Sequence, residues 1–379
     1  MTARAVETQD APRYVAPEDH MPIEAIDHVA FWVGNAKQAA HFYQSTMGFE
    51  LVAYAGPETG MRGLASYVLR QGNITFLLTS GMSPEDPMTQ FAHKHGDGVR
   101  RVSLRVPDVV AAYNGAVERG ATPVEEPRFG EDAGGRAGSA TVQMYGDVLL
   151  GFVERKDYTG AYWPGFEAAG TPGKVAGVGL AAIDHIVGNV ELGKMNEWVA
   201  WFQKVMGFEL MQHFTDEAIT TEYSALMSKV MQDGSGKIKF PINEPAQGKR
   251  KSQIEEYLDF NIGPGVQHIA MITGDIVATV DALKQRGLQF LTVPKEYYDD
   301  LWDRVGPIRE DVGEIERLNI MVDRDEEGYL LQIFTQPVED RPTLFFEVIQ
   351  RRGSRGFGEG NFKALFEAIE REQDRRGNL

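Results

Sequence analysis

One phrase occurs twice in this chain. The segment AIDHVAFWVGNAKQAAHFYQSTMGFEL begins at Ala25, and AIDHIVGNVELGKMNEWVAWFQKVMGFEL begins at Ala182. In both copies an apolar strand pattern leads into a helix pattern that ends at a glycine, and a second strand pattern follows. Internal similarity of this kind indicates that a structural unit is duplicated. A duplicated unit does not require a duplicated site, so the two copies have to be compared residue by residue.

Each copy opens a β-α-β-β-β unit, and a second unit of the same pattern follows it. We expect the second unit to begin at Val99 and the fourth to begin at Val266. The fourth unit is expected to contain a strand at LQFLTVP, a polar insertion over residues 295–318, and strands at YLLQIFTQ and TLFFEVIQR. The pattern therefore predicts an α+β fold with two tandem units in each half.

The length of the chain indicates more than one domain. At 379 residues it exceeds one typical core, so we expect two domains. The predicted segments are a loose arm over 1–22, an N-terminal domain over 23–156, a linker rich in Gly, Pro and Ala over 157–180, a C-terminal domain over 181–356, and a terminal helix over 357–379. The apolar residues of that helix are Phe362, Leu365, Phe366 and Ile369. They share one face and follow several glycines, so we expect the helix to dock on the body and to move.

Composition excludes several classes of protein. The net charge of −17 and the pI near 5.0 disfavour nucleic-acid binding, and we interpret the short basic run Lys249–Lys251 as a solvated loop. The absence of cysteine excludes disulfides, zinc–thiolate sites, iron–sulfur clusters and cysteine nucleophiles. No basic-then-apolar leader and no run of about 18 apolar residues is present, so we expect no signal peptide, no membrane span and a cytoplasmic location.

The two halves differ at three aligned positions. His28 aligns with His185, because both follow the same Ile-Asp pair. VRRVSL aligns with VQHIAM, which places Arg101 opposite His268. DVLLGFVER aligns with TLFFEVIQR, which places Gly151 opposite Glu347 and rests on the match of the terminal arginines, Arg155 and Arg351.

Only the second half therefore offers a set of metal ligands. His185, His268 and Glu347 supply two imidazoles and a carboxylate, the donor set that suits non-haem Fe(II) with positions left open. Fe(II) or Mn(II) is favoured over structural zinc. A histidine in an apolar strand can also be a satisfied core residue, and we interpret His28 in that way. The remaining histidines are expected at the surface: His20, His41, His93, His95 and His213.

The motifs of the second half resemble those of one enzyme family. IDHIVGNV, PINEP, GKRKSQIEEYL, GVQHIA, GYLLQIFTQ, LFFEVIQR and GFGEGNF occur in the order found in the 4-hydroxyphenylpyruvate dioxygenase family. The resemblance covers the chain from about Ile23 to Phe366. It implies the vicinal-oxygen-chelate fold, in which paired β-α-β-β-β modules form two open-barrel domains with a C-terminal helix.

The resemblance also implies an activity. Members of this family convert 4-hydroxyphenylpyruvate and O2 into homogentisate and CO2 in tyrosine catabolism. The reaction combines oxidative decarboxylation, ring hydroxylation and side-chain migration. One Fe(II) per subunit is implied as the cofactor, the substrate is its own 2-oxo acid, and the assembly is a homodimer or homotetramer.

Residue roles follow motif by motif from the same resemblance. His185, His268 and Glu347 are expected to hold the metal. The family pattern implies a polar pocket lining of Ser224, Asn243, Gln253, Gln267, Gln332 and Asn361, with aromatic walls at Phe334, Phe345 and Phe362. Asn361 and Phe366 fall at the start of the terminal helix, which resembles a gate over the pocket.

Three other functions are compatible with this fold. A 4-hydroxymandelate synthase uses the same metal and substrate but hydroxylates the benzylic carbon, and Phe334 and Asn243 argue against it. An extradiol catechol dioxygenase needs no 2-oxo acid, and the KRKSQIEEYL and GFGEGNF motifs argue against it. A non-catalytic ligand-binding protein of the same superfamily would not need three metal ligands.

Overall fold

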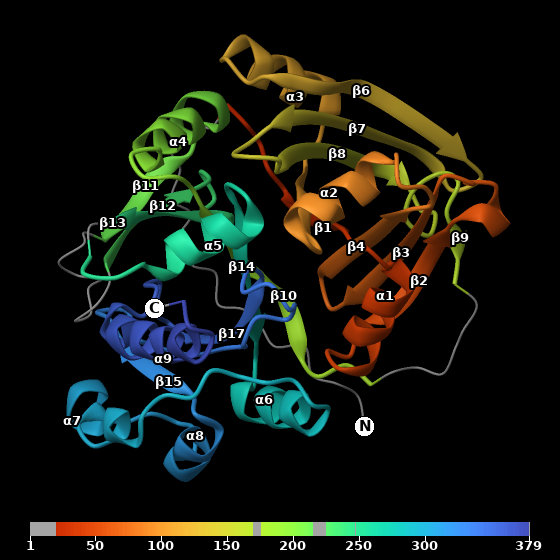
Figure 1. Cartoon of the computed structure of the whole chain (residues 1–379). Helices are drawn as coiled ribbons and strands as arrows, with labels where there is room; N and C mark the ends of the chain where they lie inside the picture. The colour runs from red at the N-terminus through yellow and green to blue at the C-terminus, as the bar shows by residue number, and fades with distance from the viewer. Residues whose placement is uncertain (1–19, 170–175, 215–224, 247, 379) are drawn as a thin grey trace.

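The two halves of the chain form two curled sheets. The computed structural model describes residues 20–169, 176–214, 225–246 and 248–378. Figure 1 shows the elements of the first half, coloured red to yellow, on one side and those of the second half, green to blue, on the other. Because each half forms its own sheet, the duplication seen in the sequence is a duplication of the fold.

The first sheet has the strand order β6-β7-β8-β5-β1-β4-β3-β2-β9. Its strands are β1 Ala25–Trp32, β2 Glu50–Ala55, β3 Leu64–Gln71, β4 Ile74–Gly81, β5 Gly98–Arg105, β6 Pro123–Asp132, β7 Gly135–Gln143, β8 Leu149–Tyr158 and β9 Glu167–Ala168. The accompanying helices are α1 Ala36–Ser45, the short η1 Pro57–Thr59, α2 Pro87–His95 and α3 Val109–Glu118.

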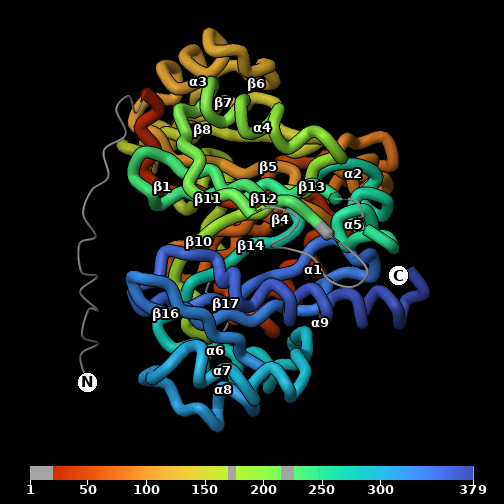
Figure 2. The backbone as a smooth tube through the Cα atoms, turned by 90° about the vertical axis from the view of Figure 1, so that its left-hand side faces the viewer, coloured from red at the N-terminus to blue at the C-terminus, as the bar shows by residue number. Residues whose placement is uncertain are grey.

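The second sheet has the strand order β11-β12-β13-β10-β14-β17-β16-β15. Its strands are β10 Leu180–Asn189, β11 Glu209–Phe214, β12 Ala225–Gln232, β13 Lys239–Ala246, β14 Gly265–Thr273, β15 Met321–Arg324, β16 Tyr329–Phe334 and β17 Phe345–Arg352. The helices are α4 Met195–Trp201 with its π-helical continuation η2 Phe202–Met206, α5 Gln253–Asn261, α6 Ile276–Gln285, η3 Lys295–Tyr298, α7 Leu301–Val305, α8 Val312–Leu318, η4 Glu359–Asn361 and α9 Phe362–Arg375. Figure 2 shows α9 running past β17.

The same strand pairings recur at the centre of both sheets. β1 pairs antiparallel with β5, which pairs parallel with β8, and β10 pairs in the same way with β14 and β14 with β17. β10, β14 and β17 are thus neighbours, and they carry the three predicted metal ligands. The fold brings these residues together from segments far apart in the sequence.

Local sequence signals explain where the crossover helices begin. Asn35, Asp108 and Asp275 cap α1, α3 and α6, each side chain accepting a hydrogen bond from a backbone N–H in the first turn at 2.9–3.1 Å. Ser252 and Glu255 form a reciprocal capping box at the start of α5. Such caps satisfy N–H groups that have no partner inside the helix.

The fourth unit departs from the expected pattern. LQFLTVP does not form a strand; it contributes a single bridge between Phe290 and Thr335, and η3 begins directly after Pro294. Proline has no N–H to donate to a sheet ladder, which favours the end of pairing at this point. The outer strand of the unit is instead β15, which follows the insertion and pairs with β16. The insertion itself is helical, in η3, α7 and α8.

The segment expected as a linker is partly structured. β8 extends to Tyr158, β9 lies at Glu167–Ala168 and pairs with β2, and Tyr162 is buried against the first sheet. The guanidinium of Arg155 lies 4.7 Å from the centre of the Tyr162 ring. Residues 158–168 therefore cover the open side of the first sheet.

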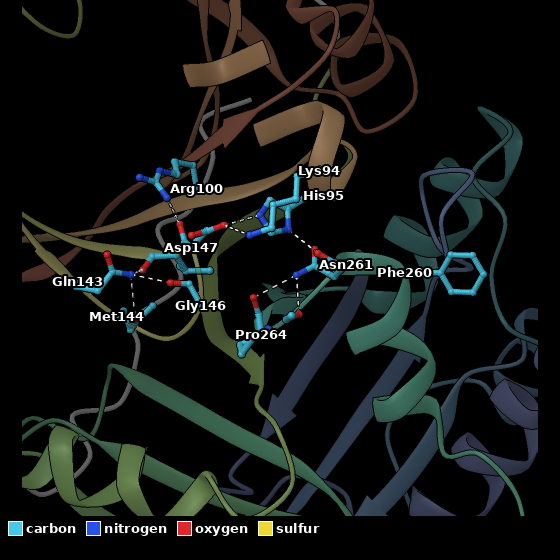
Figure 3. A network of polar contacts seen from close by, with 12 residues as sticks. Lys94, His95, Arg100, Gln143, Met144, Gly146, Asp147, Phe260, Asn261 and Pro264 are labelled. Atoms are coloured by element: carbon cyan, nitrogen blue, oxygen red, sulfur yellow. Dashed lines mark hydrogen bonds and ion pairs between the residues drawn. The ribbon is translucent and has the colours of Figure 1, made fainter. Parts of the chain in front are cut away.

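The two halves share one hydrophobic core and a polar contact. Phe346 of β17 lies 5.9 Å from the ring of Tyr43 and 6.0 Å from that of Phe76, both in the first half. Figure 3 shows the polar contact, in which the ring of His95 lies between Asp147 and the main-chain oxygen of Asn261. His95 is only 3% exposed, so the expectation that it lies at the surface is wrong. His20, His41, His93 and His213 are exposed as expected.

None of the helices in the described ranges combines the length and apolar character that crossing a bilayer requires.

Candidate metal centre

His185 is oriented by a chain of hydrogen bonds behind it. Its Nδ1 lies 2.8 Å from Asp184 Oδ1, and Arg351 holds that carboxylate with two further hydrogen bonds. Asp184 is 8% exposed and His185 is 3% exposed. Because Nδ1 donates its proton to the carboxylate, Nε2 is the ring nitrogen that faces the centre of the domain.

His268 and Glu347 complete the centre. His268 Nδ1 lies 2.9 Å from the side-chain oxygen of Gln267, which again leaves Nε2 to face inward. Glu347 Oε2 lies 3.1 Å from His185 Nε2 and 3.5 Å from His268 Nε2. One ligand atom from each residue falls within 4.8 Å of the others, the only such group of three found among the described residues.

Burial and mutual charge set the protonation of these groups. Burial by itself raises the pKa of Glu347, but the two imidazoles outweigh it and lower that pKa to about 2. Burial lowers the pKa of His268, and the carboxylate of Glu347 only partly offsets this. For His185 burial also acts downward, but Glu347 and Asp184 outweigh it and raise the pKa above its usual value. The carboxylate is therefore ionised and needs a cation.

These residues fit a divalent metal ion. Two imidazole nitrogens and one carboxylate oxygen converge on one point, and they form the ligand set of open non-haem iron sites. Both histidines have a partner on the outer nitrogen, as metal-bound histidines almost always do. Without an ion, an anionic carboxylate would remain buried with only two imidazoles as partners.

Among the described residues of the first half, no equivalent centre is present. His28 Nδ1 lies 2.7 Å from Asp27, and its Nε2 lies 3.0 Å from Ser103 Oγ. Burial lowers the pKa of His28 to about 4 despite Asp27, so the ring is neutral and both nitrogens are engaged. Ser103 pairs with Gly151 as Ala270 pairs with Glu347, which confirms the alignment of Gly151 with Glu347.

A small cavity lies against the three converging residues. Its volume is about 70 Å³. Seven of the residues expected around the substrate or in the gate lie on its wall: Asn243, Gln253, Gln267, Phe334, Phe345, Phe362 and Phe366. The rings of His268 and Phe345 are stacked with centroids 4.8 Å apart, and the Phe334 ring stands at right angles to His268 at 5.8 Å. The aromatic wall therefore starts directly beside the ligand atoms.

Two predicted pocket residues lie beside the cavity rather than on its wall. Gln332 pairs with Ile349, two residues along the strands from the Phe334–Glu347 pair, and its side chain lies against Gly358. Asn361 is fully buried and accepts a hydrogen bond from Tyr297 Oη at 2.6 Å. A residue that shares a strand face with a pocket residue can still lie outside the cavity, because two residues along a strand span about 6.6 Å. Ser224 lies outside the described residues.

Sequence reasoning missed part of the wall. Ser228 lines the cavity and pairs directly with Asn243 across β12 and β13. The side chains of directly paired residues project from the same face of a sheet, so a register for β12 would have revealed it. The apolar residues not foreseen are Val187, Phe214, Leu226, Val230, Pro241 and Phe357.

The fold and the buried His-His-Glu group define a class of protein. Residues 182–333 match the family model "Glyoxalase/Bleomycin resistance protein/Dioxygenase superfamily", and residues 18–163 match "Hydroxyphenylpyruvate dioxygenase, HPPD, N-terminal". A solved structure of a 4-hydroxymandelate synthase mutant from Streptomyces coelicolor superimposes with a TM-score of 0.83, at 32% identity over 93% of this chain and 100% of that chain. The molecule is therefore an enzyme of this superfamily and is built from tandem modules.

Relatives that match this chain over nearly its whole length identify the family within the superfamily. The chain is 47% identical to "4-hydroxyphenylpyruvate dioxygenase" of Dictyostelium discoideum, over 94% of this chain and 100% of the relative. It is 48% identical to the protein of the same name from Danio rerio, over 93% of this chain and 91% of the relative. The chain belongs to the 4-hydroxyphenylpyruvate dioxygenase family.

Proposed function

We propose that this protein is a dioxygenase that converts 4-hydroxyphenylpyruvate and O2 into homogentisate and CO2. The single observation that carries the proposal is the buried convergence of His185, His268 and Glu347 in a chain of this family. We propose these three residues as the ligands of one Fe(II) per chain. When bound, Fe(II) supplies adjacent open positions at which a 2-oxo acid and O2 can meet.

The protein's own residues orient the ligands of that centre. Asp184 and Gln267 accept the Nδ1 protons of His185 and His268, which fixes both rings with Nε2 inward. Glu347 supplies the negative charge, held ionised by its surroundings. This preorganisation means that metal binding does not have to reorient any of the three side chains.

The remaining wall suits a phenol with an apolar ring. Phe334 and Phe345 lie beside the ligand atoms and would enclose the aromatic ring. Asn243, Gln253 and Ser228 offer amide and hydroxyl groups on the same cavity. A buried phenolic hydroxyl needs such hydrogen-bond partners, because an unpaired one would lose its interactions with water. We therefore assign these polar groups to the substrate's hydroxyl end, together with the amide of Gln267.

Helix α9 closes the pocket. Phe362, Leu365, Phe366 and Ile369 line the cavity from this helix. Ligand sites for molecules of drug size span about 300–1,000 Å³, whereas this cavity measures about 70 Å³. Admission of an aromatic 2-oxo acid therefore requires α9 to move outward. Its return excludes water from the reacting centre.

The test is oxygen uptake by the Fe(II)-loaded protein with 4-hydroxyphenylpyruvate, followed by chromatographic identification of the product. Homogentisate with release of CO2 is the expected result. A second candidate, 4-hydroxymandelate synthase, is favoured only by the structural likeness noted above, and 4-hydroxymandelate as the product would establish it instead. Oxygen uptake with catechols but not with the keto acid would overturn both.

The same proposal extends to the setting of the enzyme. We place it in tyrosine catabolism in the cytoplasm, as a homodimer or homotetramer. Mass measurement of the intact protein under native conditions tests the assembly, and a monomer at all concentrations would contradict it.

A further inference from the structure

The first domain contains a cavity of its own. Its volume is about 430 Å³, and His28, Ala30, Arg101, Leu149 and Val153 line it from the central strands β1, β5 and β8. It therefore occupies the place in the first sheet that the metal centre occupies in the second. A volume of this size lies within the range of small-molecule sites.

Arg101 stands where the second domain has a metal ligand. Arg101 pairs with Ala30 across β5 and β1, as His268 pairs with Val187 across β14 and β10. A Cβ added at Gly151 would lie 2.7 Å from Ser103 Oγ and 3.1 Å from Arg101 Cδ. The glycine thus makes room for the arginine stem. A fixed guanidinium charge takes the place that a metal ion would need.

The guanidinium of Arg101 has one ion-pair partner, Glu125, but makes no close hydrogen bond. Its Nη1 lies 3.5 Å from both Glu125 Oε2 and Thr141 Oγ1, at the outer limit of hydrogen bonding. Its Nε is buried and has no partner. Arginine has five N–H donors, and leaving buried donors unpaired costs free energy. Arg101 therefore retains donors for a ligand in the cavity.

The other charges around the cavity leave it positive. Asp27 and the Tyr162 carbonyl engage Arg155, and Asp27 lies 2.9 Å from its Nε. The side chain of Arg128, which also lines the cavity, makes no ion pair or hydrogen bond with the described residues. Glu125 is the one carboxylate among the described lining residues, and Thr141 already donates to it at 2.9 Å. Arg100, which also lines the cavity, adds to Arg101 and Arg128, and these three positive charges outweigh the single negative charge.

The rest of the wall is mostly apolar: four aromatic side chains lie among aliphatic ones, and the neutral polar residues are Ser66, Thr79 and Ser139. Tyr162, Trp163 and Phe166 cover the cavity from the segment between β8 and β9, and Trp32 lines it from β1. Flat apolar walls favour a planar body, and a guanidinium fork matches the two oxygens of a carboxylate.

We propose that the cavity of the first domain binds a small organic acid with one carboxylate, paired with Arg101, and a planar apolar body. The site is separate from the metal centre and does not depend on the proposed activity. It uses arginine for the anion-binding role that a metal ion has in the second domain.

The experiment titrates the metal-loaded protein with 2-naphthoate and follows tryptophan fluorescence, because Trp32 and Trp163 line the cavity. The matched probe 2-naphthol has the same ring system without the carboxylate, and inorganic phosphate tests for a general anion site. The variants are Arg101→Met and Arg128→Met, with circular dichroism as the check on folding. His185→Ala serves as the control in which the metal centre, but not this cavity, is altered.

We expect saturable 1:1 quenching by 2-naphthoate in the wild-type protein and in His185→Ala. Arg101→Met should weaken binding about tenfold or more, because a charge-assisted hydrogen bond is lost. Arg128 is exposed and replaceable at little structural cost, so Arg128→Met should weaken binding about twofold to fivefold even if Arg101→Met fails to fold. Equal binding of 2-naphthol, equal binding of phosphate, loss of binding in His185→Ala alone, or no saturable quenching would each overturn the proposal.

Discussion

Arg351 donates two hydrogen bonds to Asp184, from Nε to Oδ2 at 2.8 Å and from Nη2 to Oδ1 at 2.7 Å. Burial alone would raise the pKa of Asp184, but Arg351 and His185 hold it well below its usual value. The first domain repeats the arrangement, with Arg155 and Asp27 behind His28. The brace therefore belongs to the duplicated fold, while only the second copy combines it with converging ligands.

Asp184→Asn tests the brace at the metal centre. Asparagine keeps the shape but loses the charge that fixes Arg351 and the His185 tautomer, so metal affinity should fall about tenfold or more. Competition with a chelator of known affinity measures the change. Asp27→Asn is the matched control: it should lower stability, because Asp27 also binds Arg105 and Arg155, yet leave metal affinity unchanged. An equal loss of affinity in both variants would contradict the assignment.

Glu339→Gln should stabilise the protein at neutral and higher pH. Burial, with Asp97 beside it, raises the pKa of Glu339 to about 9, against 4.5 for the ordinary group. The folded state therefore holds one more proton than the unfolded state between these two pH values. Stability is fully present below about pH 4.5 and declines as the pH rises towards about 9.

Glutamine removes that dependence without removing the side chain. The free energy of unfolding at pH 8 should rise by about 1–3 kcal/mol, and the gain should vanish near pH 4. Urea unfolding at several pH values measures it. Glu326→Gln, an exposed site, is the control and should change stability little. A gain that is the same at pH 4 and pH 8 would show that ionisation of Glu339 is not its cause.

Glu256→Gln should loosen the end of α9. Glu256 is 2% exposed and binds Arg376 Nη2 at 2.7 Å and Asn378 Nδ2 at 2.9 Å. Loss of the ion pair should speed amide hydrogen exchange over residues 362–375 about tenfold. Asp374→Asn, an exposed change on the same helix, should leave exchange as it is. Unchanged exchange in Glu256→Gln would mean that apolar contacts alone hold the gate.

The site residues that differ between the two copies of the repeat could be predicted from the sequence. Comparison of the two halves was enough to select His185, His268 and Glu347, because His268 and Glu347 have counterparts, Arg101 and Gly151, that cannot serve as ligands. Strand periodicity likewise located most strands. Both signals are local or arise from the repeat, so neither needed the tertiary structure.

Contacts between distant segments could not be predicted in this way. His95 is buried because Asn261 and Asp147 meet over it across the two halves, and nothing adjacent to His95 in sequence signals this. Predicting Ser228 as a wall residue required the register of β12. Predicting the edge strand β15 required the path of the helical insertion before it. The cavity beside Arg101 could not be predicted, because the close approach of Gly151 to Arg101 is a feature of the tertiary structure.

We expect the duplicated fold to carry one metal centre, in the second copy. Metal content after reconstitution with Fe(II) under anaerobic conditions tests it most directly. The wild-type protein and His28→Ala should each bind one iron per chain. His185→Ala, His268→Ala and Glu347→Ala should each lose most of it, together with turnover. Two irons per chain, or loss of iron in His28→Ala with retention in the other three variants, would contradict the account.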